Sequence, residues 1–121
     1  MEVLASRIIL RPRDFDEALH FYRDQLGLGI FREYPGGGVV FFAGQSLIEV
    51  AGHGEQKAGA TILLQVRDVE ATYAELEAAG VEIVRPPTTE PWGLTEMWIA
   101  DPDGNSLVVV EVPPGHPQRR G

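Results

Sequence analysis

The chain has 121 residues, a net charge of −8, and ordinary proportions of hydrophobic (44%) and charged (23%) residues. This length suits one domain, or two small halves that share a sheet. The basic residues are scattered apart from Arg119 and Arg120, which argues against nucleic-acid binding. The absence of cysteine excludes disulfides and thiolate metal ligands. The sequence has neither an apolar run of membrane-spanning length nor a signal-peptide pattern, so we expect a cytoplasmic protein with no membrane partner.

The first half of the sequence predicts one helix among four strands. A short apolar strand at residues 7–11 leads to a helix that Asp14 or Asp16 can cap. Apolar residues then recur at three- and four-residue intervals as far as Leu26, and Gly27 ends the helix. Three further strands are expected at residues 28–34, 39–43 and 47–51, with a glycine turn at residues 36–38.

The second half repeats this pattern after residues 53–60, a polar segment with glycines that we interpret as a linker. A strand at residues 61–66 precedes a helix that begins near Asp68 and stops at Gly80. The segment that follows is expected to contain strands at 81–84, 94–101 and 106–112, with a loop at 86–93 between the first two.

Two short sequences show that the halves are related. Residues 10–15, LRPRDF, match residues 64–69, LQVRDV, at a constant offset of 54 (64 − 10). We therefore predict the same βαβββ unit written twice. The expected organisation is a first module at 1–52, a linker at 53–60, a second module at 61–112 and a flexible tail at 113–121.

The stretch around residues 101–105, DPDGN, predicts a β-hairpin. Proline fixes one turn conformation, glycine permits a positive φ, and Asp and Asn side chains bond the local backbone. The apolar run at 107–110 predicts a strand that is buried on both faces. This turn accounts for Asp101 and Asp103 without an acid–base pair or a calcium loop.

The run RDFDEALHFYRDQLGL, followed later by DPDGN, resembles the vicinal oxygen chelate superfamily, which includes glyoxalase I and bleomycin-resistance proteins. The resemblance extends from about Ala5 to Val112. It implies an α+β fold in which two βαβββ modules form a cup-shaped mixed sheet, usually completed in a homodimer. The superfamily contains isomerases, dioxygenases, epimerases, thiol transferases and drug-binding proteins, so this resemblance does not decide the activity.

The metal enzymes of this superfamily have ligands at four points, which the repeat maps onto Arg7, Glu49, Thr61 and Val108. Only Glu49 is a competent ligand, because arginine stays protonated, valine has no donor atom and a lone threonine hydroxyl binds poorly. A one-residue shift would substitute Val109 and change nothing. We therefore predict no metal and no cofactor. Arg7 and Glu49 are then either a buried ion pair that fixes strand register, or a pair in which Arg7 also presents charge to a ligand.

Strand alternation predicts which side chains line the cup. Phe42 or Phe41 belongs there, and Trp92 in the expected loop would cover one mouth. An apolar, aromatic lining is typical of a small-molecule pocket, although Trp98 as plain core and Trp92 as a surface plug is the alternative. The predicted ligand-binding residues are Arg7, Ile9, Arg11, Phe42, Leu47, Glu49, Thr61, Leu63, Gln65, Trp92, Glu96, Trp98 and Val108.

Three functions remain open at this point. The leading one is a metal-free homodimer that sequesters a hydrophobic or aromatic drug or metabolite, as bleomycin-resistance-type proteins do. The second is an enzyme of the lyase, isomerase or dioxygenase kind, with Glu49 as general base or metal ligand. The third is a non-catalytic dimeric module of a larger assembly.

Overall fold

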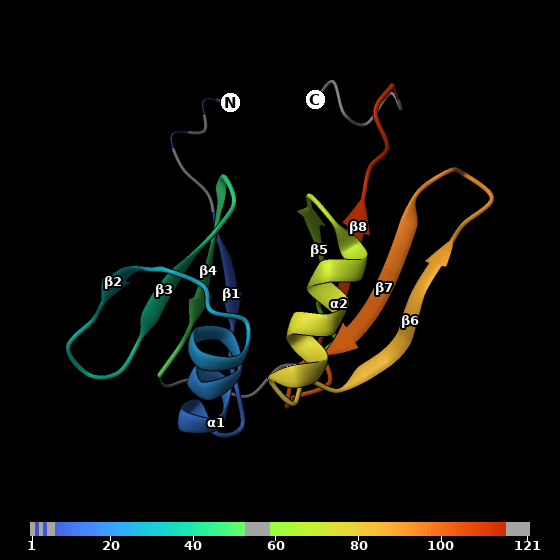
Figure 1. Ribbon diagram of the computed structural model, residues 1–121. Coiled ribbons are helices and arrows are strands. Elements are labelled where there is room, and N and C mark those ends of the chain that lie inside the picture. The colour runs from blue at the N-terminus through green and yellow to red at the C-terminus, as the bar shows by residue number, and fades with distance from the viewer. Residues whose placement is uncertain (1, 3, 5–6, 53–58, 116–121) are drawn as a thin grey trace. The chain divides into compact units, whose positions relative to one another are not determined.

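The computed structural model describes residues 2, 4, 7–52 and 59–115 (Figure 1). Most of the expected linker and of the expected tail lies outside the described residues. The chain divides into two compact units, Met1–Ala60 with Pro102–Gly104 and Thr61–Asp101 with Asn105–Gly121. Within the described residues, no helix has both the length and the apolar character needed to cross a membrane.

The first unit has one helical segment and one four-stranded sheet in the order β1-β4-β3-β2 (Figure 1). Strand β1 pairs in parallel with β4, whereas the β4–β3 and β3–β2 pairs are antiparallel. The helix begins as α1 and continues without a break as the π-helix η1. The elements are β1 (Ile8–Leu10), α1 (Phe15–Leu19), η1 (His20–Gln25), β2 (Ile30–Glu33), β3 (Val39–Ala43) and β4 (Ser46–Val50).

The second unit repeats this connectivity in a second four-stranded sheet, of order β5-β8-β7-β6. Strand β5 is parallel to β8, and the other two pairs are antiparallel. The predicted βαβββ repeat and the α+β class are confirmed. The elements are β5 (Thr61–Val66), α2 (Val69–Ala78), β6 (Ile83–Thr89), β7 (Thr95–Ala100) and β8 (Ser106–Glu111).

Both helices start with the same capping contact. The carboxylate of Asp14 accepts a hydrogen bond from the Glu17 amide at 3.1 Å, and that of Asp68 accepts one from the Ala71 amide at 3.0 Å. Each contact satisfies an amide that the first helical turn leaves unpaired. The choice between Asp14 and Asp16 is thus settled in favour of Asp14, and both caps lie within the repeated sequence.

The helix of each unit packs on only one face of its sheet. In the first unit Phe41 is fully buried and its ring lies 6.4 Å from that of Tyr22. The next residue, Phe42, points to the other face and is 47% exposed. It shares that face with Leu47, its cross-strand partner. We call the face opposite the helix the open face of each unit. Of the two alternatives Phe41 and Phe42, it is therefore Phe42 that lies on the open face.

The DPDGN turn has the expected structure. The Asp101 carboxylate accepts hydrogen bonds from the backbone amide and the side-chain amide of Asn105, both at 2.8 Å, and both residues are buried. Gly104 has φ +85°, which an L side chain rarely adopts. Glu111 at the end of β8 accepts a hydrogen bond from the Val69 amide at the start of α2, on the helix side of the sheet.

The expected loop at residues 86–93 is wrong in its first half. Strand β6 continues through Pro86 and Pro87 to Thr89, which pairs with Thr95 of β7. Proline is tolerated here because β6 is an edge strand, and its register shifts on both sides of Arg85. The chain turns only at Glu90–Leu94, where two backbone hydrogen bonds close the hairpin.

The paired caps yield a stability prediction. We expect Asp14→Ala and Asp68→Ala each to lower the free energy of unfolding by about 1 kcal/mol, because each loses one capping hydrogen bond. Urea denaturation followed by circular dichroism measures this. Asp16→Ala is the matched control, since it removes a first-turn charge without removing the cap. In high salt, Asp16→Ala should lower the free energy of unfolding by less than half as much as Asp14→Ala does. Equal losses for the two variants would contradict the capping assignment.

Candidate functional site

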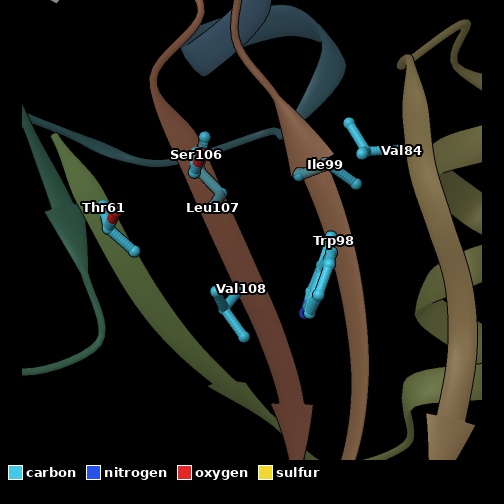
Figure 2. A pocket seen from close by; sticks show the side chains of 7 residues that line it. All are labelled: Thr61, Val84, Trp98, Ile99, Ser106, Leu107 and Val108. Atoms are coloured by element: carbon cyan, nitrogen blue, oxygen red, sulfur yellow. The ribbon is translucent and has the colours of Figure 1, made fainter. Parts of the chain in front are cut away.

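The open face of the second unit contains a pocket of about 250 Å³ (Figure 2). Three of the predicted ligand-binding residues line it, Thr61, Trp98 and Val108. Figure 2 shows Trp98 and Val108 next to each other on β7 and β8, where they are cross-strand partners. The complete lining is Thr61, Val84, Trp98, Ile99, Ser106, Leu107 and Val108.

The Trp98 ring is held by polar contacts on its edge and on one face. The Glu96 carboxylate accepts hydrogen bonds from the indole Nε1 of Trp92 at 2.8 Å and, more loosely, from that of Trp98 at 3.4 Å. The Arg85 guanidinium lies 3.7 Å from the centre of the Trp98 ring, a cation–π contact. Arg85 also forms an ion pair with Glu90. Trp98 remains 39% exposed although its orientation is fixed.

Arg85 and Glu90 were missed by the sequence analysis. Both lie in or beside the segment that was expected to be a loop, where no strand partner could be assigned. In the structure Arg85 is the register partner of Trp98 across the β6–β7 pair. Extending the strand through the two prolines is the step that would have placed Arg85 beside the tryptophan.

The far end of this open face is closed by its own side chains. Leu94, Val110 and Val112 form a buried apolar cluster, and Val108 packs against it from the pocket side. The prediction that residues 107–110 are buried on both faces therefore holds except at Val108, which is partly exposed where the pocket begins. Leu63 lies beside Val108 and is 53% exposed, whereas Gln65 lies beside the closed end.

The open face of the first unit has a polar centre. Arg7 Nε lies 3.0 Å from Glu49 Oε1, and the Arg7 guanidinium also donates to the Tyr34 hydroxyl at 3.2 Å. The side chain of Glu49 is 15% exposed and that of Arg7 is 35% exposed. These three residues line a second pocket, of about 370 Å³, together with the backbone of the β2–β3 hairpin. The predicted Arg7–Glu49 pair is therefore present, and Tyr34 is the partner that the sequence analysis missed.

Glycines make room for this arrangement. A Cβ on Gly52 would lie 2.2 Å from the carbonyl oxygen of Gly37, so the hairpin turn can approach the end of β4 only because residue 52 is glycine. A Cβ on Gly38 would lie 3.4 Å from the Tyr34 ring. The glycine turn thus brings Tyr34 and Glu49 to one pocket.

The remaining predicted residues of the first unit lie on the same open face. Ile9 is the register partner of Glu49, and Arg11 follows it with the same parity. Leu47 is half-buried, and Phe42 makes an edge-to-face contact with Phe31 at 5.2 Å. This face therefore combines an exposed apolar strip with the Arg7–Tyr34–Glu49 cluster.

The family model of the Glyoxalase/Bleomycin resistance protein/Dioxygenase superfamily matches residues 5–109. This chain belongs to that superfamily. The match covers both βαβββ units, so the repeated connectivity described above is the fold of this family.

Two relatives and one solved structure are similar to this chain over nearly their whole length. The uncharacterized protein YraH of Bacillus subtilis is 30% identical over 93% of this chain and 99% of its own. A probable lactoylglutathione lyase of Synechocystis is 25% identical over 85% of this chain and 91% of its own. A crystal structure of a superfamily member from Sphaerobacter thermophilus superposes with a TM-score of 0.77, at 26% identity over 92% of this chain and 98% of that one.

The donor set of this superfamily member does not fit the metal of its metalloenzymes. Glu49 is paired with Arg7, whose pKa is raised further above its ordinary value by the hydrogen bond to Tyr34, so this guanidinium stays charged and cannot coordinate. Thr61 and Val108 line a largely apolar pocket. Within residues 7–52 and 59–115, no three His, Cys, Asp or Glu side chains gather to hold an ion.

The contact with Arg7 makes Tyr34 a more acidic phenol than Tyr73. The hydrogen bond from Arg7 lowers the pKa of Tyr34 below 10.0, while the charge of Glu77 raises that of Tyr73 above it. Arg7→Leu should therefore raise the pKa of Tyr34 toward its ordinary value, measured as phenolate absorbance in an alkaline titration. Of the phenolate steps of Tyr34 and Tyr73, Tyr34→Phe should remove the one at lower pH.

Arg13→Leu is the control for that titration, because Arg13 pairs with Glu17 on the helix. It should leave the first phenolate step in place. A first step that is unchanged by Arg7→Leu would show that Arg7 does not donate to Tyr34 in solution.

Proposed function

We propose that this protein binds a hydrophobic, aromatic small molecule against Trp98 and acts by sequestering it. The observation that carries the proposal is the oriented Trp98 ring on one side of a preformed, mostly apolar pocket. A large apolar ring that is left exposed at such a pocket marks a binding surface more often than a surface accident.

The contacts of Trp98 explain how it would bind. Because the Arg85 guanidinium covers one face of the ring, a ligand stacks on the other. Aromatic pairs of this kind contribute about 0.5–1.5 kcal/mol beyond the burial of their area. Glu96 is buried and bonded to both indoles, so the ring needs little reorganisation when a ligand arrives.

The lining also favours binding over acid–base catalysis. The pocket residues are five apolar or aromatic side chains with one serine and one threonine, so no carboxylate, imidazole or amine faces the bound molecule. General acid–base catalysis needs such a group within hydrogen-bond reach of the substrate. A ligand held at Trp98 is therefore stored rather than converted.

A homodimer is part of this proposal. Both open faces leave large apolar side chains exposed, among them Ile9 and Phe42 in the first unit and Leu63 in the second. Association of two chains would remove part of this surface from water. Sedimentation velocity should accordingly show a dimer at micromolar concentration. We also retain the cytoplasm as the proposed location.

The second candidate is an enzyme in which Glu49 is the general base. It is favoured by the mostly buried Glu49 carboxylate in a pocket with Arg7 and Tyr34, and by the relative that carries the name probable lactoylglutathione lyase. The contact of Arg7 with Glu49 opposes it, because the ion pair occupies the carboxylate that would accept a proton. We rank this candidate below ligand binding.

Tryptophan fluorescence tests the proposal, since the chain has only two tryptophans. In Trp92→Phe, Trp98 is the sole tryptophan, and we expect 1-naphthol to quench its fluorescence in a saturable manner. Trp98→Ala should bind 1-naphthol roughly tenfold more weakly, through the loss of stacking and buried area.

Val81→Ala is a control substitution of a buried apolar residue that does not line the pocket, and it should leave the affinity unchanged. Equal affinity in Trp98→Ala and in the native protein would refute the site. Turnover of the methylglyoxal–glutathione hemithioacetal that disappears in Glu49→Gln would decide for the enzyme instead.

A further inference from the structure

The pocket at Trp98 has a polar end formed by two hydroxyl groups. Thr61 on β5 and Ser106 on β8 are direct register partners, and both side chains line the pocket (Figure 2). Neither hydroxyl makes a hydrogen bond to another residue in the described part of the chain. All other lining residues are apolar or aromatic.

The other hydroxyl side chains of this unit behave differently. Residues 61–115 contain six serines and threonines, and the four that lie outside the pocket all use their hydroxyls internally. Thr72 and Thr88 donate to backbone carbonyls, and Thr89 bonds Thr95. The two hydroxyls without an internal partner are thus the two that face the pocket.

The sheet register sets the distance between the two ends of the pocket. Trp98 pairs with Val108, and two residues further along the same face Ala100 pairs with Ser106. Two residues along a strand correspond to about 7 Å. A ring stacked on Trp98 therefore reaches the hydroxyl row through one substituent and a hydrogen bond of about 2.8 Å.

We infer that the ligand of this pocket is a single aromatic ring with one uncharged hydrogen-bonding substituent, of the phenol class. The inference rests on the proposed function and names its substrate class. The pocket of about 250 Å³ is smaller than the roughly 300–1,000 Å³ typical of drug-sized ligands, which favours one ring. Hydroxyls both donate and accept, and no charged group lines the pocket, so the substituent is neutral.

A matched pair of small ligands tests this class. Phenol and toluene have nearly the same shape and differ by a hydroxyl in place of a methyl group. We expect the native protein to bind phenol roughly three- to tenfold more tightly than toluene, which corresponds to the usual net gain from one hydrogen bond. The readout is the Trp98 indole resonance in a proton–nitrogen correlation spectrum, assigned with Trp92→Phe.

The double variant Thr61→Val with Ser106→Ala removes both hydroxyls, and it keeps a β-branched residue at position 61 and a residue of nearly the same size at position 106. It should lose the preference for phenol and bind toluene at least as tightly as phenol, because the phenol hydroxyl then has no partner in the pocket. The toluene affinity should be no weaker than in the native protein. Thr72→Val removes a hydroxyl outside the pocket and should keep the native preference. Trp98→Ala should weaken both ligands by a similar factor.

The outcomes separate this inference from the proposal beneath it. Two results would overturn the role of the two hydroxyls and leave ligand binding at Trp98 standing. One is saturable binding of both ligands with no preference for phenol, and the other is a preference for phenol that survives in the double variant. No shift of the Trp98 resonance with either ligand or with 1-naphthol would overturn both. A preference for phenol that is lost only in the double variant supports the phenol class.

Discussion

The structure depends on one constraint, which is that each four-stranded sheet has only one helix to cover it. The helix side of each sheet is buried on the inner strands, among them at Phe41 in the first unit and at Leu107 in the second, whereas the edge strands β2 and β6 have no buried residue. The opposite residues are left without cover from their own unit, and hydrophobic burial favours anything that occupies that face. A ligand, a second chain or both can meet this need, and function follows from which side chains the open faces present.

The two open faces present different chemistry although they arise from one repeated unit. In the first unit Arg7, Tyr34 and Glu49 form a compact polar cluster in which the charges compensate each other. In the second unit the corresponding positions are Thr61 and Val108, and the charged residues Arg85 and Glu96 act on the tryptophans. In the first unit, Arg7 thus contacts both of the other polar groups of the cluster. The second uses its polar groups to orient an aromatic surface.

Local patterns were sufficient to predict the fold. The DPDGN turn, the cap of the first helix and the repeated βαβββ unit are all decided by residues close in sequence, and each is confirmed. The site depends on contacts that cross strands. Tyr34 meets Arg7 across 27 residues of the chain, and Arg85 of β6 reaches Trp98 of β7 only because an edge strand accepts two prolines. The bonds from the two indoles to Glu96 span only two and four residues, but they depend on the turn that brings Trp92 back to β7. No local pattern encodes the contacts of Arg7 with Tyr34 and of Arg85 with Trp98, so the sequence could place residues on a face of a sheet but could not give the geometry between them.

We propose that this superfamily member binds a ligand without a metal, because an Arg7–Glu49 pair, a threonine and a valine stand where the resemblance to the metalloenzymes of the superfamily puts the metal ligands. The most direct test is the metal content of the purified protein by mass spectrometry after incubation with Ni²⁺, Zn²⁺, Mn²⁺ and Fe²⁺ and removal of free ions. The account predicts far less than one ion per chain, with 1-naphthol affinity unchanged by chelator. One tightly held ion per chain, lost in Glu49→Gln, would contradict it and place the protein among the metalloenzymes.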